Sequence, residues 1–357
     1  MARKKRNKYS TGRQALILVA QTLIVLILLV MVYAGYQWAR IGHGRLNLRN
    51  LEAYQDTGPY TNIALFGLDA REGQLDSGTN SDTMIIASIK NKTKEVRLVS
   101  VYRDCIMKQK DGTYAKANSA YSSGGGEEAI ALLNRNLDLD IKNYVSVNFA
   151  AMIKAIDAVG GIEVDVTEEE ISYINGYATE IIKVTGIDSK GVDHAGRQTL
   201  NGVCATAYAR IRYTEGGDFK RTERQRYVLS ELLRKAKKLP IKELSDLVDE
   251  IMPMISTSLS ATDVLSLAVN LSKYELLEAK GFPFEVSAVN NPGGMKGAFV
   301  VPVDLAKNVK ELHTYLFNNE SYTPSSKVQE ISNEVIYVTG VTPEARNVYD
   351  QDEKNGN

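Results

Sequence analysis

The stretch Val96-Arg97-Leu98-Val99-Ser100-Val101-Tyr102-Arg103-Asp104 is the one around which the rest of the chain is organised. Its apolar run predicts a buried β-strand, and an arginine and an aspartate stand at the end of that strand. In open α/β sheets, ligands bind at such strand ends. Two further charged clusters repeat the arrangement: Asp69-Ala70-Arg71 with Asn80-Ser81-Asp82, and Arg210-Ile211-Arg212 with Asp218, Arg221, Arg224 and Gln225. If all three meet, the resulting pocket suits a diphosphate and a divalent cation.

Strands and helices alternate on both sides of this stretch. Residues 62–68 and 82–89 predict two buried strands, the second forming an antiparallel hairpin with the strand at 96–101, and Gly67 permits close backbone approach before Asp69. Further strands are expected at 144–149, 162–166 and 284–289, and helices at 127–136, 150–159, from 168, within 200–212, from 218, and at 241–251, 261–272 and 304–317. Residues 183–197 are expected to be irregular, as in a flap. The predicted fold class is α/β, a mixed central β-sheet flanked by helices on both faces in three layers, with an N-terminal transmembrane helix.

Composition excludes several classes of function. The chain has 357 residues and a formal net charge of zero, so no bulk field recruits nucleic acid, and we expect no nucleic-acid partner. Three histidines lie far apart in the sequence and only two cysteines exist, whereas a zinc site needs more of these ligands or more closely spaced ones. No GxSxG, Walker A or GxGxxG motif is present.

The N-terminus predicts a membrane anchor. Residues 1–13 form a basic tail, and residues 14–39 contain no charged side chain and would span about 39 Å as a helix. Because the basic side stays inside, the remainder of the chain would lie outside the cell membrane, on a single-pass protein. A cleaved signal peptide is the competing interpretation, but the apolar run is too long for one. We expect a linker at 40–58, an extracytoplasmic domain at 59–320 and a polar extension at 321–357 that ends in a disordered tail.

From the residues alone, each charged cluster has an ordinary alternative. Asp69 and Asp82 at adjacent strand ends would repel each other unless a hard cation such as Mg²⁺ lay between them, but two loop aspartates also cap turns. The planar guanidinium groups of the arginines are suited to binding phosphate oxygens, but arginines also commonly form ion pairs at the protein surface. Cys105 and Cys204 would be either two small buried thiols or a disulfide.

Seven motifs follow one another along the chain. They are Gly67-x-Asp69-x-Arg71, Ser81-Asp82-Thr83, Ser100-Val101-Tyr102-Arg103-Asp104, Lys116-x-Asn118-x-Ala120-Tyr121, Asp157-x-x-Gly160-Gly161, Tyr208-Ala209-Arg210-x-Arg212 and Asp218-x-x-Arg221-x-x-Arg224-Gln225. In this order, and together with the basic tail and the single span, they resemble the LytR-CpsA-Psr family. The resemblance runs from about residue 60 to 238 and continues more weakly to about 318.

The resemblance implies an enzyme of the cell membrane, mostly of Gram-positive bacteria. Such a phosphotransferase moves a glycopolymer, for example teichoic acid or capsule, from a polyprenyl-diphosphate carrier onto peptidoglycan. By motif position, Asp69 and Asp82 would bind Mg²⁺ (or Mn²⁺), and the polyprenyl tail would lie in an apolar tunnel. The residues implied to bind the diphosphate are Arg71, Arg103, Arg210, Arg212, Arg221 and Gln225. The residues implied in catalysis are Arg103, Asp104, Arg210 and Arg212.

Two positions depart from the family pattern. Asn80 stands where the family usually has arginine, and Tyr102 stands where it usually has proline. Arg71 would compensate for the first. Tyr102 would either pack as an ordinary aromatic residue or stack on a sugar. Asp104 would either accept the proton of the acceptor hydroxyl or pair with an arginine. The rival functions are a polyprenyl-diphosphate phosphohydrolase and a non-catalytic lipid-binding or regulatory protein.

Overall fold

The computed structural model describes residues 42–43, 46–54, 57–68, 75 and 78–344. The predicted tail, anchor and C-terminal end, together with Asp69 and Arg71, lie outside these residues. Within the described part of the chain, no helix is both long enough and apolar enough to cross a bilayer.

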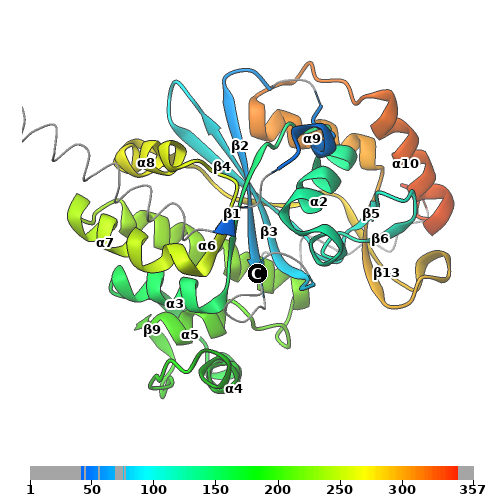
Figure 1. The fold of residues 1–357 in the computed structure, drawn as a ribbon. Helices are drawn as coiled ribbons and strands as arrows, with labels where there is room; N and C mark the ends of the chain where they lie inside the picture. Colours follow the sequence, from blue (N-terminus) through cyan, green and yellow to red (C-terminus); the bar gives the residue numbers. More distant parts are fainter. Residues whose placement is uncertain (1–41, 44–45, 55–56, 69–74, 76–77, 345–357) are drawn as a thin grey trace, which may run out of the picture. The chain divides into compact units, whose positions relative to one another are not determined.

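An eight-stranded mixed sheet forms the centre of the described structure (Figure 1). Its strand order is β1-β10-β7-β2-β3-β4-β11, and β12 also pairs with β4. The hairpin predicted from the sequence is confirmed, because β3 runs antiparallel to both β2 and β4, while β7 runs parallel to β2. The strands are β1 (Gly42–His43), β2 (Tyr60–Leu68), β3 (Ser81–Lys90), β4 (Glu95–Val101), β7 (Asn143–Val147), β10 (Ile255–Thr257), β11 (Glu275–Leu276) and β12 (Lys280–Phe282).

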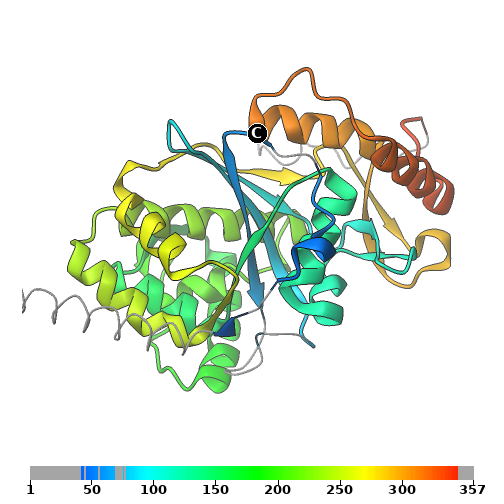
Figure 2. The same cartoon turned by 45° about the horizontal axis from the view of Figure 1, so that its top comes forward.

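Both faces of this sheet are covered, as its apolar strands require. On one face Phe66, Ile86 and Val99 are buried in a core to which α2 and α9 contribute. On the other face Ile63 and Leu98 are buried against side chains of α6 and α8. Figures 1 and 2 show the helices on either side of the strands. The mixed central sheet flanked by helices is therefore as predicted.

The helices begin and end close to the predicted positions. Thr167 forms a capping box at the start of α4, and Ser260 forms one at the start of α8. α2 begins earlier than predicted and contains non-helical backbone at Gly124 and Gly125. The helices are α2 (Ser119–Leu137), α3 (Phe149–Ala158), α4 (Glu168–Thr185), α5 (Gly202–Tyr208), α6 (Gly217–Ala236), α7 (Ile241–Ile251), α8 (Ala261–Val269), α9 (Leu305–Phe317) and α10 (Ser326–Thr339).

Among the described residues, three small two-stranded sheets lie apart from the central sheet. The strand predicted at 162–166 is β8 (Ile162–Val166), but its partner is β9 (Gly196–Leu200), so the segment expected to be irregular ends in a strand. The other two sheets are hairpins, β5 (Ile106–Lys108) with β6 (Tyr114–Lys116), and β13 (Val286–Asn290) with β14 (Ala298–Pro302).

The polar stretch after residue 320 contains α10, a helix that the sequence reasoning did not single out. Val328, Ile331 and Val335 on this helix are buried in the same core as α2 and α9. Their i, i+3, i+7 spacing was the available signal, but the surrounding serine, glutamate and asparagine residues obscured it.

Candidate active site

The sheet topology brings the predicted strand ends together at one end of the central strands. Since β3 is antiparallel to its neighbours, the end of β2, the start of β3 and the end of β4 lie together. Leu68 pairs with Ser81 after a register shift at Gly67. A Cβ added at Gly67 would lie 3.0 Å from the Thr83 side chain, so the predicted close approach at this glycine is confirmed.

Arg103 lies at the centre of a group of carboxylates at these strand ends. Its Nη1 lies 2.7 Å from Oδ1 of Asp82, and its Nε lies 3.4 Å from Asp104 and 3.6 Å from Asp218. Burial opposes the charge of Arg103, but the three carboxylates outweigh it and raise the pKa of the guanidinium above its ordinary value. Arg103 is thus held as a fixed cation at the strand end.

Asp218 connects Arg103 to the two other arginines of the site. It lies in the first turn of α6, where the helix dipole favours a carboxylate. Its Oδ1 lies 2.9 Å from Nη2 of Arg221 and 4.0 Å from Nε of Arg212, and Nη2 of Arg212 lies 3.5 Å from Asp82. The i, i+3 spacing on α6 explains the pairing of Asp218 with Arg221.

Arg221 is the most deeply buried of these cations, with a side chain that is 2% exposed. Burial, assisted by the charges of Arg103 and Arg212, lowers its pKa to about 10 in spite of Asp218. Among the described residues, the buried Nε atoms of Arg103 and Arg221 have no hydrogen-bond partner. The Nε of Arg103 faces the carboxylates of Asp104 and Asp218, so the Nε of Arg221 is the donor of this pair that is left without an acceptor in the described part of the chain.

Gln225 and Arg210 are two further predicted ligands of the diphosphate, and their surroundings differ. Gln225 is half-buried on α6, one turn after Arg221. Arg210 lies against α3 and α4: its guanidinium carbon is 4.9 Å from the ring centroid of Phe149 and 5.0 Å from that of Tyr177, and its Nη1 is 3.4 Å from Glu180.

Asp104 makes ion pairs on two sides. Its Oδ1 lies 2.8 Å from Nζ of Lys116, in addition to the contact of its Oδ2 with Arg103. The ion-pair alternative for Asp104 thus describes its contacts in this structure. Lys116 was not predicted as a site residue, and Asp218 was named in one of the charged clusters without a role of its own, although both belong to motifs that the sequence displays.

Asp82 is the described residue of the predicted metal pair. Its Oδ1 pairs with Arg103, and among the described residues its Oδ2 makes the longer contact with Arg212. Oδ2 therefore keeps lone pairs that a hard cation can use. The described ranges contain no group of three or more histidine, cysteine or acidic side chains placed to hold a metal. Asp69 directly follows Leu68, whose strand partner Ser81 precedes Asp82. An oxygen-only donor pair of this kind fits Mg²⁺ chemically.

The two departures from the family pattern differ in their surroundings. Asn80 is exposed just before β3. Tyr102 is 6% exposed and packs edge-on against Phe219, with ring centroids 4.6 Å apart. Tyr102 is therefore a packed aromatic residue, and burial raises the pKa of its hydroxyl.

The two cysteines are free thiols buried in separate cores, so the disulfide alternative is wrong. Burial raises the pKa of both thiols. They are therefore inert packing residues.

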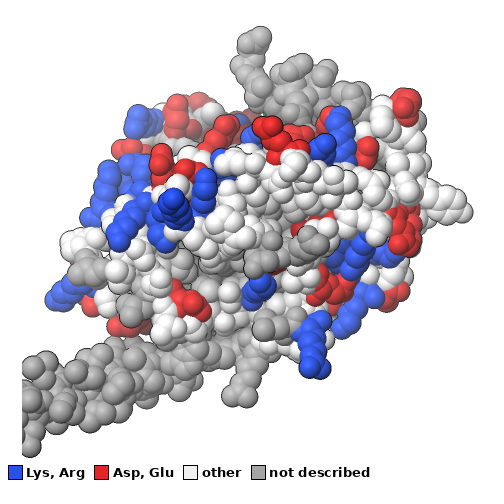
Figure 3. Space-filling view, turned by 90° about the horizontal axis from the view of Figure 1, so that it is seen from above, with Lys and Arg blue, Asp and Glu red and all other residues white. Residues whose placement is uncertain are grey.

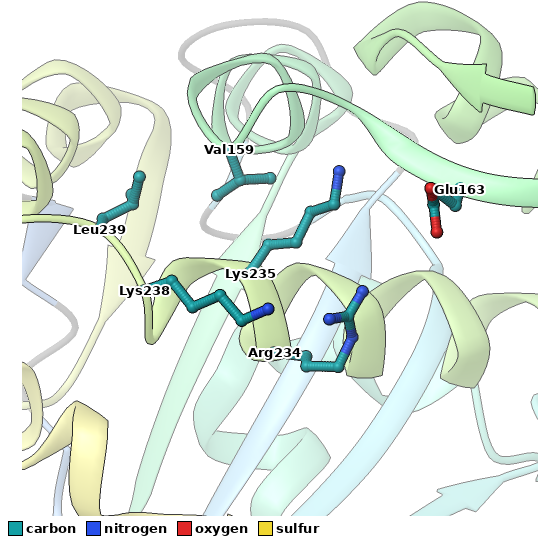
Figure 4. A pocket seen from close by; sticks show the side chains of 6 residues that line it. All are labelled: Val159, Glu163, Arg234, Lys235, Lys238 and Leu239. Carbon is teal, nitrogen blue, oxygen red and sulfur yellow. The ribbon is translucent and has the colours of Figure 1, made fainter.

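A cavity of about 430 Å³ lies at the opposite end of α6 from Asp218 (Figure 4). Three of its charged groups already have partners: Lys235 donates to the carbonyl of Gly161, Arg234 pairs with Glu231, and Glu163 pairs with Arg197. The cavity contains none of the predicted site residues. Figure 3 shows basic and acidic side chains interspersed over the face that it presents, in keeping with the zero net charge.

The chain is similar to known proteins over most of its length. The family model described as LytR_cpsA_psr matches residues 39–310. The polyisoprenyl-teichoic acid–peptidoglycan teichoic acid transferase TagU of Enterococcus faecalis is 29% identical over 249 residues, which cover 67% of this chain and 74% of that protein. Biofilm regulatory protein A of Streptococcus mutans is 33% identical over 190 residues, which cover 50% of this chain and 45% of that protein.

Solved structures share the fold. A protein of Enterococcus faecalis described as a transcriptional regulator superimposes with a TM-score of 0.60 at 22% identity, over 85% of this chain and 100% of that one. TagV of Bacillus subtilis superimposes with a TM-score of 0.55 at 25% identity, over 74% of this chain and 98% of that one. With a family match over most of its length and its motifs in register, the chain belongs to the LytR-CpsA-Psr family.

Proposed function

We propose that this protein is a membrane-anchored phosphotransferase that moves a glycopolymer from a polyprenyl-diphosphate carrier onto peptidoglycan outside the cell. Family membership supports this function, as do several relatives named teichoic acid transferases. The observation that carries the proposal is the cluster of Arg103, Arg212 and Arg221 at a strand end, in which the Nε of the buried Arg221 makes no hydrogen bond to a described residue.

In this proposal the arginines bind the oxygens of the diphosphate. Before substrate arrives, Asp82, Asp104 and Asp218 partly neutralise them and hold their geometry. Arg221 gains most from an anion, because its charge is buried and its pKa is lowered. Fixed guanidinium groups stabilise charge on the transferring phosphoryl group without reorganising. Arg71 and Gln225 would add contacts at the edge of the cluster.

We assign the metal to Asp82 and Asp69. When bound there, Mg²⁺ (or Mn²⁺) would neutralise charge on the diphosphate oxygens. Asp82 would then be shared between the cation and Arg103, so it would orient the arginine as well as the metal.

The transfer forms one phosphorus–oxygen bond and breaks another. A hydroxyl oxygen of peptidoglycan attacks the phosphorus attached to the glycopolymer, polyprenyl phosphate leaves with the bridging oxygen, and the hydroxyl proton passes to a base. Asp104 lies in the cluster, but Lys116 and Arg103 already pair with its carboxylate. We therefore assign Asp104 to positioning Arg103 and leave the base unassigned.

The test is turnover by the purified full-length chain in detergent. A polyprenyl-diphosphate-linked glycolipid and peptidoglycan fragments are supplied with Mg²⁺ or with EDTA, beside Asp82→Ala. We expect Mg²⁺-dependent ligation that the variant loses. Release of polyprenyl phosphate without ligation would instead identify a phosphohydrolase. Tight lipid binding with no product in any condition would indicate a lipid-binding or regulatory protein.

A further inference from the structure

Aromatic side chains border the arginine cluster on the side of α4. Tyr213 directly follows Arg212 and is 71% exposed. Its ring faces that of Tyr173 on α4, with centroids 6.3 Å apart and an angle of 33° between the planes. A single exposed aromatic residue needs no explanation, but a pair beside an anion site is a candidate binding surface.

Charged groups continue this surface. One turn along α4 from Tyr173, the ring of Tyr177 lies 5.0 Å from the guanidinium carbon of Arg210. Glu180, three residues further on, is 3.4 Å from Arg210 and its side chain is 60% exposed. The i, i+4, i+7 spacing puts Tyr173, Tyr177 and Glu180 on one face of α4. The surface thus combines the exposed ring of Tyr213 and the half-buried rings of Tyr173 and Tyr177 with a paired donor and acceptor, Arg210 and Glu180.

The exposure of Tyr213 does not come from a loosely held segment. The buried Arg224 donates to the carbonyl of Ile211 at 3.3 Å and to Oγ1 of Thr214 at 2.9 Å, so its two bonds hold the chain on either side of Tyr213. Arg224 is itself fixed by Glu170 of α4, with Nη2 to Oε1 at 2.7 Å. Tyr213 is therefore presented to solvent on an anchored backbone, which lowers the entropic cost of binding.

The chemistry of this surface fits a sugar ring. A pyranose has an apolar face of C–H groups that stacks on an aromatic ring, and hydroxyls at its rim that need both donors and acceptors. In a diphosphate-linked glycan, the first sugar is bonded directly to the phosphate that the arginines would hold. The Cα atoms of Arg210 and Arg212 can be no more than about 7 Å apart. Arg212 extends to Asp82 in the cluster and Arg210 to Glu180 on α4, so neighbouring positions of one segment connect the cluster with this surface.

We propose that Tyr173, Tyr177 and Tyr213, with Arg210 and Glu180, form a sugar-binding subsite beside the diphosphate cluster. This inference rests on the proposed function, and it names the pyranose next to the reacting phosphate as the occupant. The sugar belongs either to the donor lipid or to the peptidoglycan acceptor, and both offer the same chemistry.

The test compares Tyr213→Ala and Tyr213→Phe with the native full-length chain. Tyr337→Ala is the matched control, because Tyr337 is 90% exposed on α10 and belongs to no part of the site. The probes are polyprenyl diphosphate carrying N-acetylglucosamine, sugar-free polyprenyl diphosphate, peptidoglycan fragments and a free N-acetylglucosamine tetramer. Binding is measured by calorimetry, and the KM for each substrate by turnover.

We expect Tyr213→Ala to weaken binding of the sugar-bearing lipid about tenfold, which corresponds to the loss of one stacked ring. Binding of the sugar-free lipid should not change, Tyr213→Phe should lose less than Tyr213→Ala because it keeps the ring, and Tyr337→Ala should behave like the native chain. A rise confined to the KM for peptidoglycan fragments would assign the subsite to the acceptor sugar.

Equal loss for sugar-bearing and sugar-free lipid, or no loss for any probe, would overturn the subsite. If the native chain binds the tetramer through Tyr213 but neither lipid, the subsite stands and the proposed function falls. If the native chain binds none of the probes, both proposals fall.

Discussion

Arg103 is the residue on which three carboxylates converge, so its removal tests the cluster most directly. We expect Arg103→Ala to lower kcat by about 100-fold or more, as the loss of one fixed donor to a transition state does elsewhere. The fold should survive, because the side chain lies at a strand end and not in the apolar core. Turnover and circular dichroism measure the two effects. Arg197→Ala, which removes an exposed arginine from a surface pair, is the control. Unchanged turnover in Arg103→Ala would remove Arg103 from the site.

Arg221 provides a test by ligand binding instead of turnover. Because burial lowers its pKa, a bound anion should stabilise the folded protein by compensating the buried charge. We expect inorganic diphosphate at about ten times its Kd to add about 1.4 kcal/mol to the free energy of unfolding. Thermal unfolding should show a raised Tm in the native chain and a smaller rise in Arg221→Gln. An equal rise in both would argue against diphosphate contact at Arg221.

At the scale of elements, the ion pair of Glu170 and Arg224 joins α4 to α6. Both side chains are buried, at 7% and 4% exposure. Removing one partner leaves a buried charge, so Arg224→Met should lower the free energy of unfolding by about 3 kcal/mol. The double variant Glu170→Leu with Arg224→Met should recover most of this loss. Chemical denaturation measures both, and a double variant no more stable than the single one would contradict this expectation.

The packing of α9 against α2 contains a histidine that responds to pH. His313 donates to the carbonyl of Leu137 and stacks on Tyr322, with ring centroids 3.6 Å apart. Burial lowers the pKa of His313, although Asp138 and Asp140 act in the opposite direction. The unfolded chain therefore binds the proton more readily, and stability is lost as the pH falls below about 6.5.

The contribution of this histidine to the pH dependence of the free energy of unfolding should reach at most about 1.4 kcal/mol per pH unit. His313→Gln should flatten the pH dependence of the free energy of unfolding between about pH 7 and pH 5, even if it is less stable at neutral pH. An unchanged slope in the variant would show that other groups cause the acid sensitivity.

For the whole molecule, the predicted anchor at residues 14–39 remains a proposal, because it lies outside the described residues. We expect the full chain to sediment with membranes, to resist carbonate extraction and to dissolve in detergent. A variant lacking residues 1–41 should be soluble and unfold at the same Tm. An intact mass that lacks the N-terminal segment would instead indicate a cleaved signal peptide.

The central hairpin and much of the candidate site were predictable from the sequence. Strands β2, β3 and β4 are short apolar runs bounded by turns. Their antiparallel order brings Asp82, at the start of β3, next to Arg103, after the end of β4. The partner of β8 was not predictable, since β9 lies about thirty residues further along and carries no distinctive pattern. Pairing between distant segments depends on packing that local periodicity does not contain.

The sequence by itself determined which residues stand at strand and helix ends, because periodicity and turn chemistry are properties of neighbouring residues. Only the tertiary structure decided which charge faces which. It pairs Arg224 with Glu170, directs Arg210 toward α4, and makes Asp218 the common partner of Arg103, Arg212 and Arg221. These choices follow from desolvation: once distant elements pack together, a buried charge must find an opposite charge within reach, and the fold determines which one that is.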